Sequence, residues 1–305
     1  MGRRKKTAAV HAMVFSLFSL PTVYAAEEKG AEKQPRYVKY EKIAENAEEL
    51  YGEYIPVLMY HHFAERDMGI GNGVVTSTKE LEDHLKYFRS EGWRIISLEE
   101  LDRVLERAES RKLAKRDSSM GLNLDIKYLC ITMDDGYYSN YEFGYPLFEK
   151  YRASASIFAV TDSITEQTGI RKFTWKQAQE MEESGWVKVY SHSADHVPVK
   201  KGKEDAFLAS MQKSEKALEE NLKGTHVKAM AYPNGRYTEK VQQLMDEEGY
   251  KLQFTIEKGV ITGQTERNAI PRITVESGMD GRDVIREIEL AAEKTFAAER
   301  EGNVT

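Results

Sequence analysis

The strongest constraint on this chain is the alternation of short apolar runs with amphipathic stretches between residues 54 and 300. Runs such as 128–133 (YLCITM) and 187–191 (VKVYS) predict buried strands, whereas 76–93 and 205–223 carry apolar residues at helical spacing. About seven predicted strands alternate with helices, which is typical of a single parallel α/β domain. A closed (β/α) barrel and an open doubly wound sheet both satisfy this pattern.

Polar residues gather where the predicted strands end. The carboxyl ends of parallel strands meet at one edge of a barrel or sheet, so these residues are expected to lie close together. They are His61 and His62 after the first strand, Asp134 and Asp135 after a second, His192 after a third, and residues 232–235 after a fourth.

The acidic pair lies in the sequence TMDDG at 132–136. Two adjacent carboxylates at the end of a buried strand cost free energy unless a cation or hydrogen bonds compensate them. An Asx-capped turn is the alternative, because Asp-Gly on its own is a turn signal.

A second cluster, HSADH at 192–196, places His192 and His196 four residues apart, on one side of a helical or compact backbone. The chain has one cysteine, Cys130, within an apolar run, so we expect it in the core and exclude a site built on paired thiolates. A metal must then rest on histidine and carboxylate ligands. Such ligands suit catalytic Zn²⁺, and Co²⁺, Ni²⁺ or Fe²⁺ also fit them.

These motifs resemble a known family. TMDDG, HSADH and the stretch 173–193 that leads into the second motif are similar to the polysaccharide deacetylases of the NodB homology type, carbohydrate esterase family 4. The opening PVLMYHHF at 56–63, followed by a helix and RIISLEEL at 94–101, is similar to the circularly permuted poly-N-acetylglucosamine deacetylases. The resemblance spans residues 55–275 and implies a deformed (β/α) barrel of about seven parallel strands.

The resemblance also implies roles for individual residues. Asp135, His192 and His196 become the ligands of a divalent metal, most simply Zn²⁺, and Asp134 becomes the general base. His61 becomes the catalytic acid, with the neighbouring His62 left open as an alternative.

A third motif, AYPNG at 231–235, corresponds to the segment that holds the oxyanion. The resemblance assigns the backbone amide of Tyr232 to that task and includes Pro233 and Gly235 in the substrate segment. No arginine precedes Pro233, so Arg272 is the candidate that orients Asp134; a surface ion pair is the alternative.

The function implied is metal-dependent hydrolysis of N-acetyl groups on an extracellular N-acetylhexosamine polysaccharide of the poly-N-acetylglucosamine type, with release of acetate. Removal of O-acetyl groups from xylan, deacetylation of peptidoglycan, and a catalytically silent carbohydrate-binding homologue are the alternatives. The net charge of −6 argues against nucleic acid as a partner.

The chain begins with a basic segment, an uncharged apolar stretch and small residues, the pattern of an export signal. We therefore predict a signal peptide at 1–25, a charged tether at 26–53, a deacetylase domain at 54–300, and a secreted or cell-surface protein. An uncleaved membrane anchor is the alternative for the first segment.

Overall fold

The computed structural model describes residues 50, 52–66, 73–117, 120–224 and 226–302. All of them belong to one compact unit, Lys39–Thr305. The predicted signal peptide and almost all of the predicted tether lie outside the described residues. No helix in the described part of the chain is long and apolar enough to cross a membrane.

Seven parallel strands close into a barrel. The ring closes because β1 (Val57–Tyr60) pairs with both β10 (Ile270–Thr274) and β5 (Tyr128–Asp135). The other strands follow in the order β9 (Leu252–Lys258), β8 (Ala229–Ala231), β7 (Val187–Ser191) and β6 (Ala155–Ala159). The predicted α/β class and deformed barrel are confirmed.

Two short features extend the barrel. β4 (Arg94–Ile95) pairs with the first residues of β5, whose later residues pair with β1. β2 (His62–Ala64) and β3 (Val75–Ser77) form a separate two-stranded parallel sheet directly after β1.

The barrel is irregular around β8. β7 and β8 share a single register pair, Ser191 with Met230, and the register between β9 and β10 shifts between Ile270 and Arg272. β10 was not predicted as a strand, and its second residue is Pro271, a residue type that central strands rarely contain.

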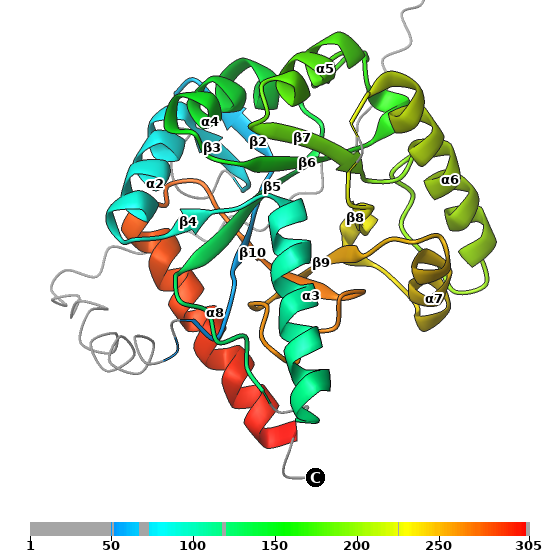
Figure 1. The fold of residues 1–305 in the computed structure, drawn as a ribbon. Helices are drawn as coiled ribbons and strands as arrows, with labels where there is room; N and C mark the ends of the chain where they lie inside the picture. The colour runs from blue at the N-terminus through cyan, green and yellow to red at the C-terminus, as the bar shows by residue number, and fades with distance from the viewer. Residues whose placement is uncertain (1–49, 51, 67–72, 118–119, 225, 303–305) are drawn as a thin grey trace, which may run out of the picture. The chain divides into compact units, whose positions relative to one another are not determined.

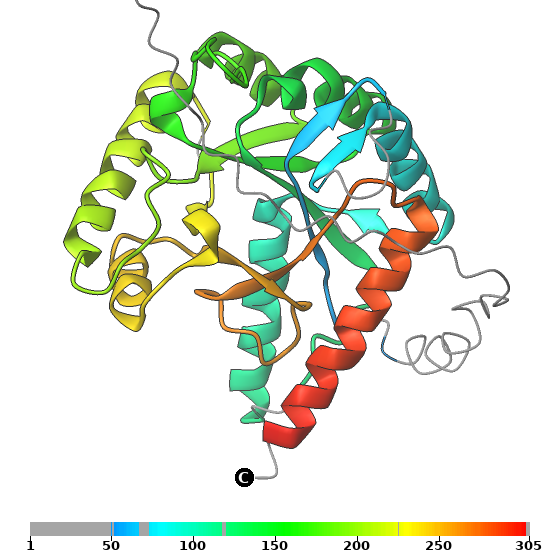
Figure 2. The ribbon, with the colours of Figure 1, turned by 180° about the vertical axis from the view of Figure 1, so that it is seen from behind.

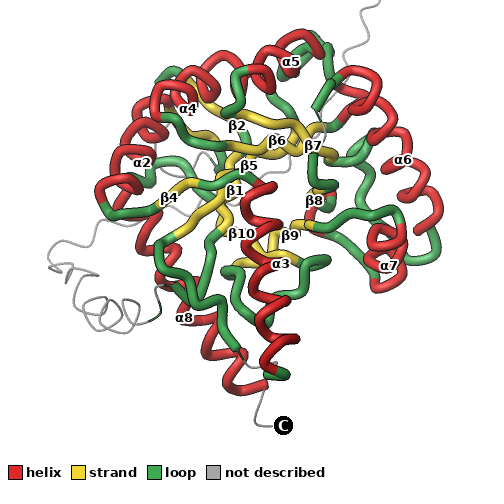
Figure 3. Tube along the Cα trace, viewed as in Figure 1, coloured by secondary structure: helices red, strands yellow, loops and turns green. Residues whose placement is uncertain are grey.

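Helices surround the strands, as Figures 1 and 3 show. They are α2 (Thr78–Ser90), α3 (Leu98–Lys115), α4 (Tyr145–Tyr151), α5 (Trp175–Glu183), α6 (Glu204–Asn221), α7 (Glu239–Glu247) and α8 (Gly281–Gly302). Ser77 begins α2 with a capping box, in which its hydroxyl accepts from the amide of Glu80 and the Glu80 carboxylate accepts from the amide of Ser77. α2 packs against α8, the red helix of Figure 2.

The amino end of the barrel is closed by α3. Its buried leucines, including Leu101 and Leu105, share one core cluster with Val57, Cys130 and Phe158 from the strands. The predicted burial of Cys130 is confirmed. α3 continues through Arg111–Lys115, where the residues favour a helix although most of them are polar. With this end filled, the polar groups gather at the opposite, carboxyl ends of the strands.

Candidate active site

A buried ion pair lies inside the barrel near the carboxyl end of β5. The guanidinium of Arg272, on β10, donates two hydrogen bonds of 2.7 Å to the carboxylate of Asp134, one to each oxygen. Arg272 also donates to the carbonyl of Thr255 and to the hydroxyl of Thr132. Both charged residues are at most 2 % exposed, so each depends on the other for compensation of its charge.

The surroundings keep Asp134 ionised. Burial alone raises the pKa of this carboxyl, but the charge of Arg272, then those of His192 and His61 together with the arginine hydrogen bonds, outweigh burial and lower the pKa to about 2. The sequence-based alternative of a surface ion pair for Arg272 is therefore wrong, because the pair is fully buried.

Next to this pair, three potential metal ligands converge. The Asp135 Oδ1 atom lies 3.4 Å from Nε2 of His196 and 3.7 Å from Nε2 of His192. Ligand atoms of these three residues all lie within 4.8 Å of one another. Ligands around one tetrahedral Zn²⁺ lie about 3.3 Å apart, so the cluster needs little movement to hold one ion.

Further contacts orient two of the three side chains. Nδ1 of His192 lies 2.8 Å from the carbonyl of Ala231, which can only accept a hydrogen bond, so Nδ1 carries the hydrogen and Nε2 of the neutral ring carries the lone pair. Burial lowers the pKa of His192 and favours that neutral form. The hydroxyl of Tyr137 donates to Oδ2 of Asp135 at 2.7 Å and leaves Oδ1 facing the histidines. This donor set fits a divalent metal.

The backbone around the cluster is unusual. Among the described residues, eight that are not glycine have a left-handed φ, and four of them lie here: Asp135 (73°), Ser193 (65°), His196 (57°) and Asn234 (54°). Left-handed backbone costs about 1 kcal/mol or more for such residues and persists only where the surroundings enforce it. Its concentration at one end of the barrel is typical of a functional site.

The structure distinguishes the two neighbouring histidines. Nδ1 of His62 lies 3.0 Å from the hydroxyl of Ser139, and its ring packs edge-on against Tyr137. Nδ1 of His61 is buried and has no hydrogen-bond partner among the described residues, while its charge acts on Asp134. His61 therefore has the freer ring beside the acidic pair.

The prediction for the amide of Tyr232 is wrong. Its N–H donates to the carbonyl of Phe254 at 2.9 Å, because the chain still pairs with β9 at this residue, and its ring is fully buried. Pro233 and Gly235 form a 3₁₀ turn directly beyond it. Asn234, between them, is exposed, and no partner for its N–H is found among the described residues.

Sequence reasoning missed three residues around the site. Tyr137 was not recognised as a partner of Asp135, and Lys172, whose ammonium donates to the Asp135 carbonyl at 2.9 Å, was not singled out. Asn140 donates to the carbonyl of His61 at 2.7 Å. The signal for Tyr137 and Asn140 was their position within five residues after Asp135; nothing local indicated Lys172.

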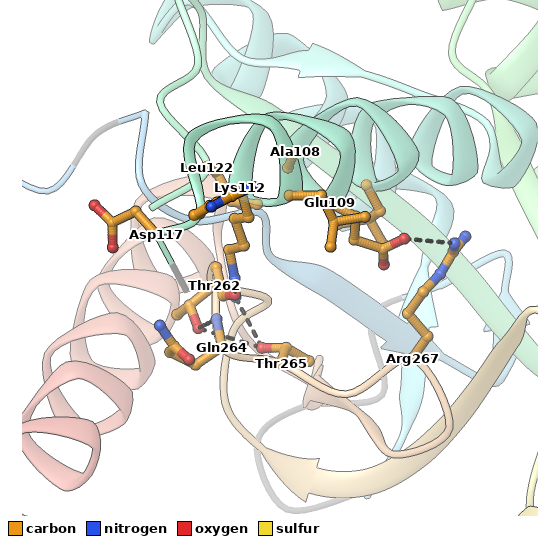
Figure 4. A pocket seen from close by; sticks show the side chains of 13 residues that line it. Ala108, Glu109, Lys112, Asp117, Leu122, Thr262, Gln264, Thr265 and Arg267 are labelled. Atoms are coloured by element: carbon orange, nitrogen blue, oxygen red, sulfur yellow. Dashed lines mark hydrogen bonds and ion pairs between the residues drawn. The ribbon is translucent and has the colours of Figure 1, made fainter. Parts of the chain in front are cut away.

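A separate cavity of about 710 Å³ lies between α3 and the loop at 262–267 (Figure 4). Arg267 crosses it to Glu109 with an ion pair of 3.6 Å. None of the predicted site residues lines this cavity, so it is distinct from the cluster around Asp135.

Comparison with known proteins places this geometry in context. Residues 122–253 match the family model described as polysaccharide deacetylase. The Bacillus subtilis protein YxkH, which bears the name of a polysaccharide deacetylase, is 29% identical over 231 residues, 74% of this chain and 73% of the relative. The Staphylococcus epidermidis poly-beta-1,6-N-acetyl-D-glucosamine N-deacetylase is 28% identical over 65% of this chain and 67% of its own length.

Solved structures share the fold. The Streptococcus pyogenes deacetylase PplD, solved in complex with acetate, has a TM-score of 0.63 at 24% identity and covers 77% of this chain and 98% of its own. IcaB from Ammonifex degensii has a TM-score of 0.62 at 24% identity over 77% of this chain and 96% of its own.

Proposed function

We propose that this chain, which carries a polysaccharide deacetylase domain, removes N-acetyl groups from an extracellular N-acetylhexosamine polysaccharide of the poly-N-acetylglucosamine type. Polysaccharide deacetylases that act on N-acetyl groups are hydrolases of amide bonds. The observation that carries the proposal is the juxtaposition of an arginine-paired carboxylate, Asp134, with the three convergent ligands Asp135, His192 and His196. Acetate and a free amine are the products.

Asp135, His192 and His196 would hold a divalent metal, and Zn²⁺ suits two imidazoles and one carboxylate best. When bound, such an ion supplies Lewis acidity, which makes water acidic and polarises a carbonyl. Co²⁺, Ni²⁺ and Fe²⁺ would also fit the ligand set.

Asp134 acts as the general base in this proposal. Arg272 occupies both carboxylate oxygens and keeps the group ionised, so it is ready to accept a proton from the attacking water. A carboxylate of such low basicity suffices only for water that is already acidified, which is why base and metal ligands must be adjacent.

The developing negative charge on the acetyl oxygen needs a hydrogen-bond donor. The amide of Asn234 is the candidate that replaces Tyr232, since it is exposed in the turn directly after β8. A preorganised backbone donor of this kind typically contributes a factor of about 10² to 10³ to the rate.

His61 completes the reaction as general acid. As the bond between the acetyl carbon and the nitrogen breaks, the imidazolium donates its proton to the leaving amine, and the water oxygen remains on the acetyl carbon as acetate. An amine is a poor leaving group without that proton, so the step depends on His61.

The substrate class rests on the relatives and on the sequence. The staphylococcal relatives are named for poly-beta-1,6-N-acetyl-D-glucosamine, a polymer made of N-acetylhexosamine. The predicted export signal at 1–25 would place the enzyme outside the cytoplasm, where such polymers occur, and the protein is therefore proposed to be secreted or bound to the cell surface.

The test is release of acetate from β-1,6-linked N-acetylglucosamine oligomers by the metal-loaded protein, with acetylated xylan and peptidoglycan in parallel. We expect Asp134→Asn to abolish turnover while the metal content stays near that of the wild type, and His192→Ala to lose the metal as well. Equal metal loss in both variants, or acetate from only xylan or peptidoglycan, would contradict the proposal.

A further inference from the structure

Two adjacent buried polar residues, Ser139 and Asn140, connect the segment after Asp135 to the segment that carries His61. The Asn140 side chain donates to the carbonyl of His61 at 2.7 Å. The Ser139 hydroxyl accepts from the amide of Phe63 at 3.0 Å and lies 3.0 Å from Nδ1 of His62. Two consecutive side chains thus hold three consecutive residues some 77 positions earlier in the sequence. We call the side chains of Ser139 and Asn140 the Ser139–Asn140 clamp.

The local backbone is built to bring these side chains there. Asn140 begins a five-residue π-helix, η2 (Asn140–Gly144), a rare conformation that is found frequently at functional sites. η2 packs closely on β2: a Cβ at Gly144 would lie 2.8 Å from the Phe63 ring. The close packing leaves little freedom for the turn between β1 and β2.

The clamp is not the arrangement that stability alone would select. Ser139 and Asn140 are 5 % and 1 % exposed, and Oδ1 of Asn140 is buried without a hydrogen-bond partner among the described residues. A buried unsatisfied oxygen costs about 1–3 kcal/mol, so an apolar residue would pack here at lower cost. The amide group is explained by its one bond, to the carbonyl of His61.

We propose that Ser139 and Asn140 are positioning residues, which fix the backbone of His61 so that its imidazole faces the leaving nitrogen of the substrate. The inference rests on the proposed function, because it assigns these residues to the acid of that reaction. Neither residue contacts the three ligands Asp135, His192 and His196 through a hydrogen bond of its side chain. Loss of the clamp therefore affects proton donation and leaves metal binding intact.

Two substrates separate proton donation from the rest of the reaction. An N-acetyl amide needs a proton on its nitrogen before the carbon–nitrogen bond breaks. In the ester 4-nitrophenyl acetate, by contrast, the leaving group is 4-nitrophenolate, a stable anion that departs without being protonated. Both substrates need the same attacking water, base and oxyanion donor. A defect confined to His61 therefore lowers amide hydrolysis and spares the ester.

The experiment compares both rates in Asn140→Leu, which keeps the branched shape of the side chain but removes the donor to the carbonyl of His61. We expect kcat on the N-acetylglucosamine oligomer to fall about tenfold or more, KM to stay near the wild-type value, and ester hydrolysis to stay within about threefold. In a His61→Ala background, Asn140→Leu should cause little further loss of amide hydrolysis, because the two residues act through one step.

Controls keep the outcome unambiguous. Asn221→Leu is the matched control, since Asn221 also donates from its side chain to a carbonyl, that of Ala217 at 2.8 Å, away from the site. This variant should keep both rates. If Asn140→Leu does not fold, Ser139→Ala replaces it, with Ser139→Thr expected to restore activity because it keeps the hydroxyl.

Three outcomes would overturn the proposed role of the clamp. They are parallel loss of amide and ester hydrolysis, loss of metal, and full amide activity in both clamp variants. A wild-type protein that cleaves the ester but no acetylated glycan would instead overturn the proposed function, and with it the assignment of the clamp to an acid.

Discussion

At the scale of single residues, the site depends on one charge balance. Asp134 is buried and yet ionised, and the reason is the two-pronged contact from Arg272, which is itself buried. Removing one partner of a buried pair leaves the other charge uncompensated and typically costs about 3–5 kcal/mol. Catalysis and stability are therefore coupled at this pair.

We expect Arg272→Met to lower the free energy of unfolding by about 3–5 kcal/mol and acetate release by about 100-fold or more, because Asp134 would then take up a proton. Urea unfolding and the acetate assay measure the two effects. Arg267→Met is the control: its partner Asp102 keeps Lys251 at 3.5 Å, so we expect unchanged turnover and a loss of about 1 kcal/mol or less. Wild-type turnover in Arg272→Met would show that the arginine does not support the base.

At the scale of elements, His84 joins three parts of the fold. It lies on α2, fully buried, with Nδ1 3.0 Å from the hydroxyl of Tyr60 on β1 and Nε2 2.8 Å from the carbonyl of Met279, just before α8. The Met279 carbonyl can only accept a hydrogen bond, so Nε2 of His84 carries the hydrogen and the Tyr60 hydroxyl donates to Nδ1 of a neutral ring. Burial lowers the pKa of His84 below its ordinary value of 6.5, against weaker opposing effects of Met279 and nearby acidic groups.

This predicts a pH dependence of stability. The pKa of His84 is lower in the folded protein than in the unfolded chain, so the unfolded chain takes up a proton first as the pH falls. The contribution of neutral His84 to the free energy of unfolding is therefore complete above about pH 6.5 and is lost progressively below it. We expect the unfolding free energy of the wild type to fall between pH 7 and 5, at no more than about 1.4 kcal/mol per pH unit from this group. His84→Gln should reduce that slope in urea titrations; an identical slope in both proteins would assign it to other groups.

At the scale of the whole molecule, the three proposed ligands join β5 to the segment after β7, with β6 between them. The unfolded chain does not hold these groups together, so a metal that binds them stabilises the folded state. At a free metal concentration of 100 times Kd, binding adds about 2.7 kcal/mol to the free energy of unfolding.

We expect Zn²⁺ to raise the thermal midpoint by about 5–10 °C and EDTA to reverse the shift. His196→Ala should abolish most of the shift, whereas His226→Ala, which removes a histidine paired with Glu182 outside the cluster, should keep it. Equal shifts in the two variants would mean that the ion binds elsewhere. Differential scanning calorimetry with and without metal provides the measurement.

Local sequence patterns were sufficient to predict most of the helices and strands, and they placed the polar groups at the carboxyl ends of the strands. Apolar periodicity and strand length are local properties, so the alternation and the positions of Asp134, Asp135 and His192 after buried strands could be predicted from short windows. The roles assigned to these residues and to His61 stay predictions until the variants above are measured.

Which distant groups meet depends on how the barrel closes. Closure of the barrel sets β10 beside β1 and brings Arg272 onto Asp134, 138 residues away. The Tyr232 amide, which the family resemblance assigned as the oxyanion donor, instead donates to the carbonyl of Phe254, and a π-helix brings Asn140 to His61. Hydrogen-bond partners depend on strand order and register, and neither is encoded in any one segment of the chain.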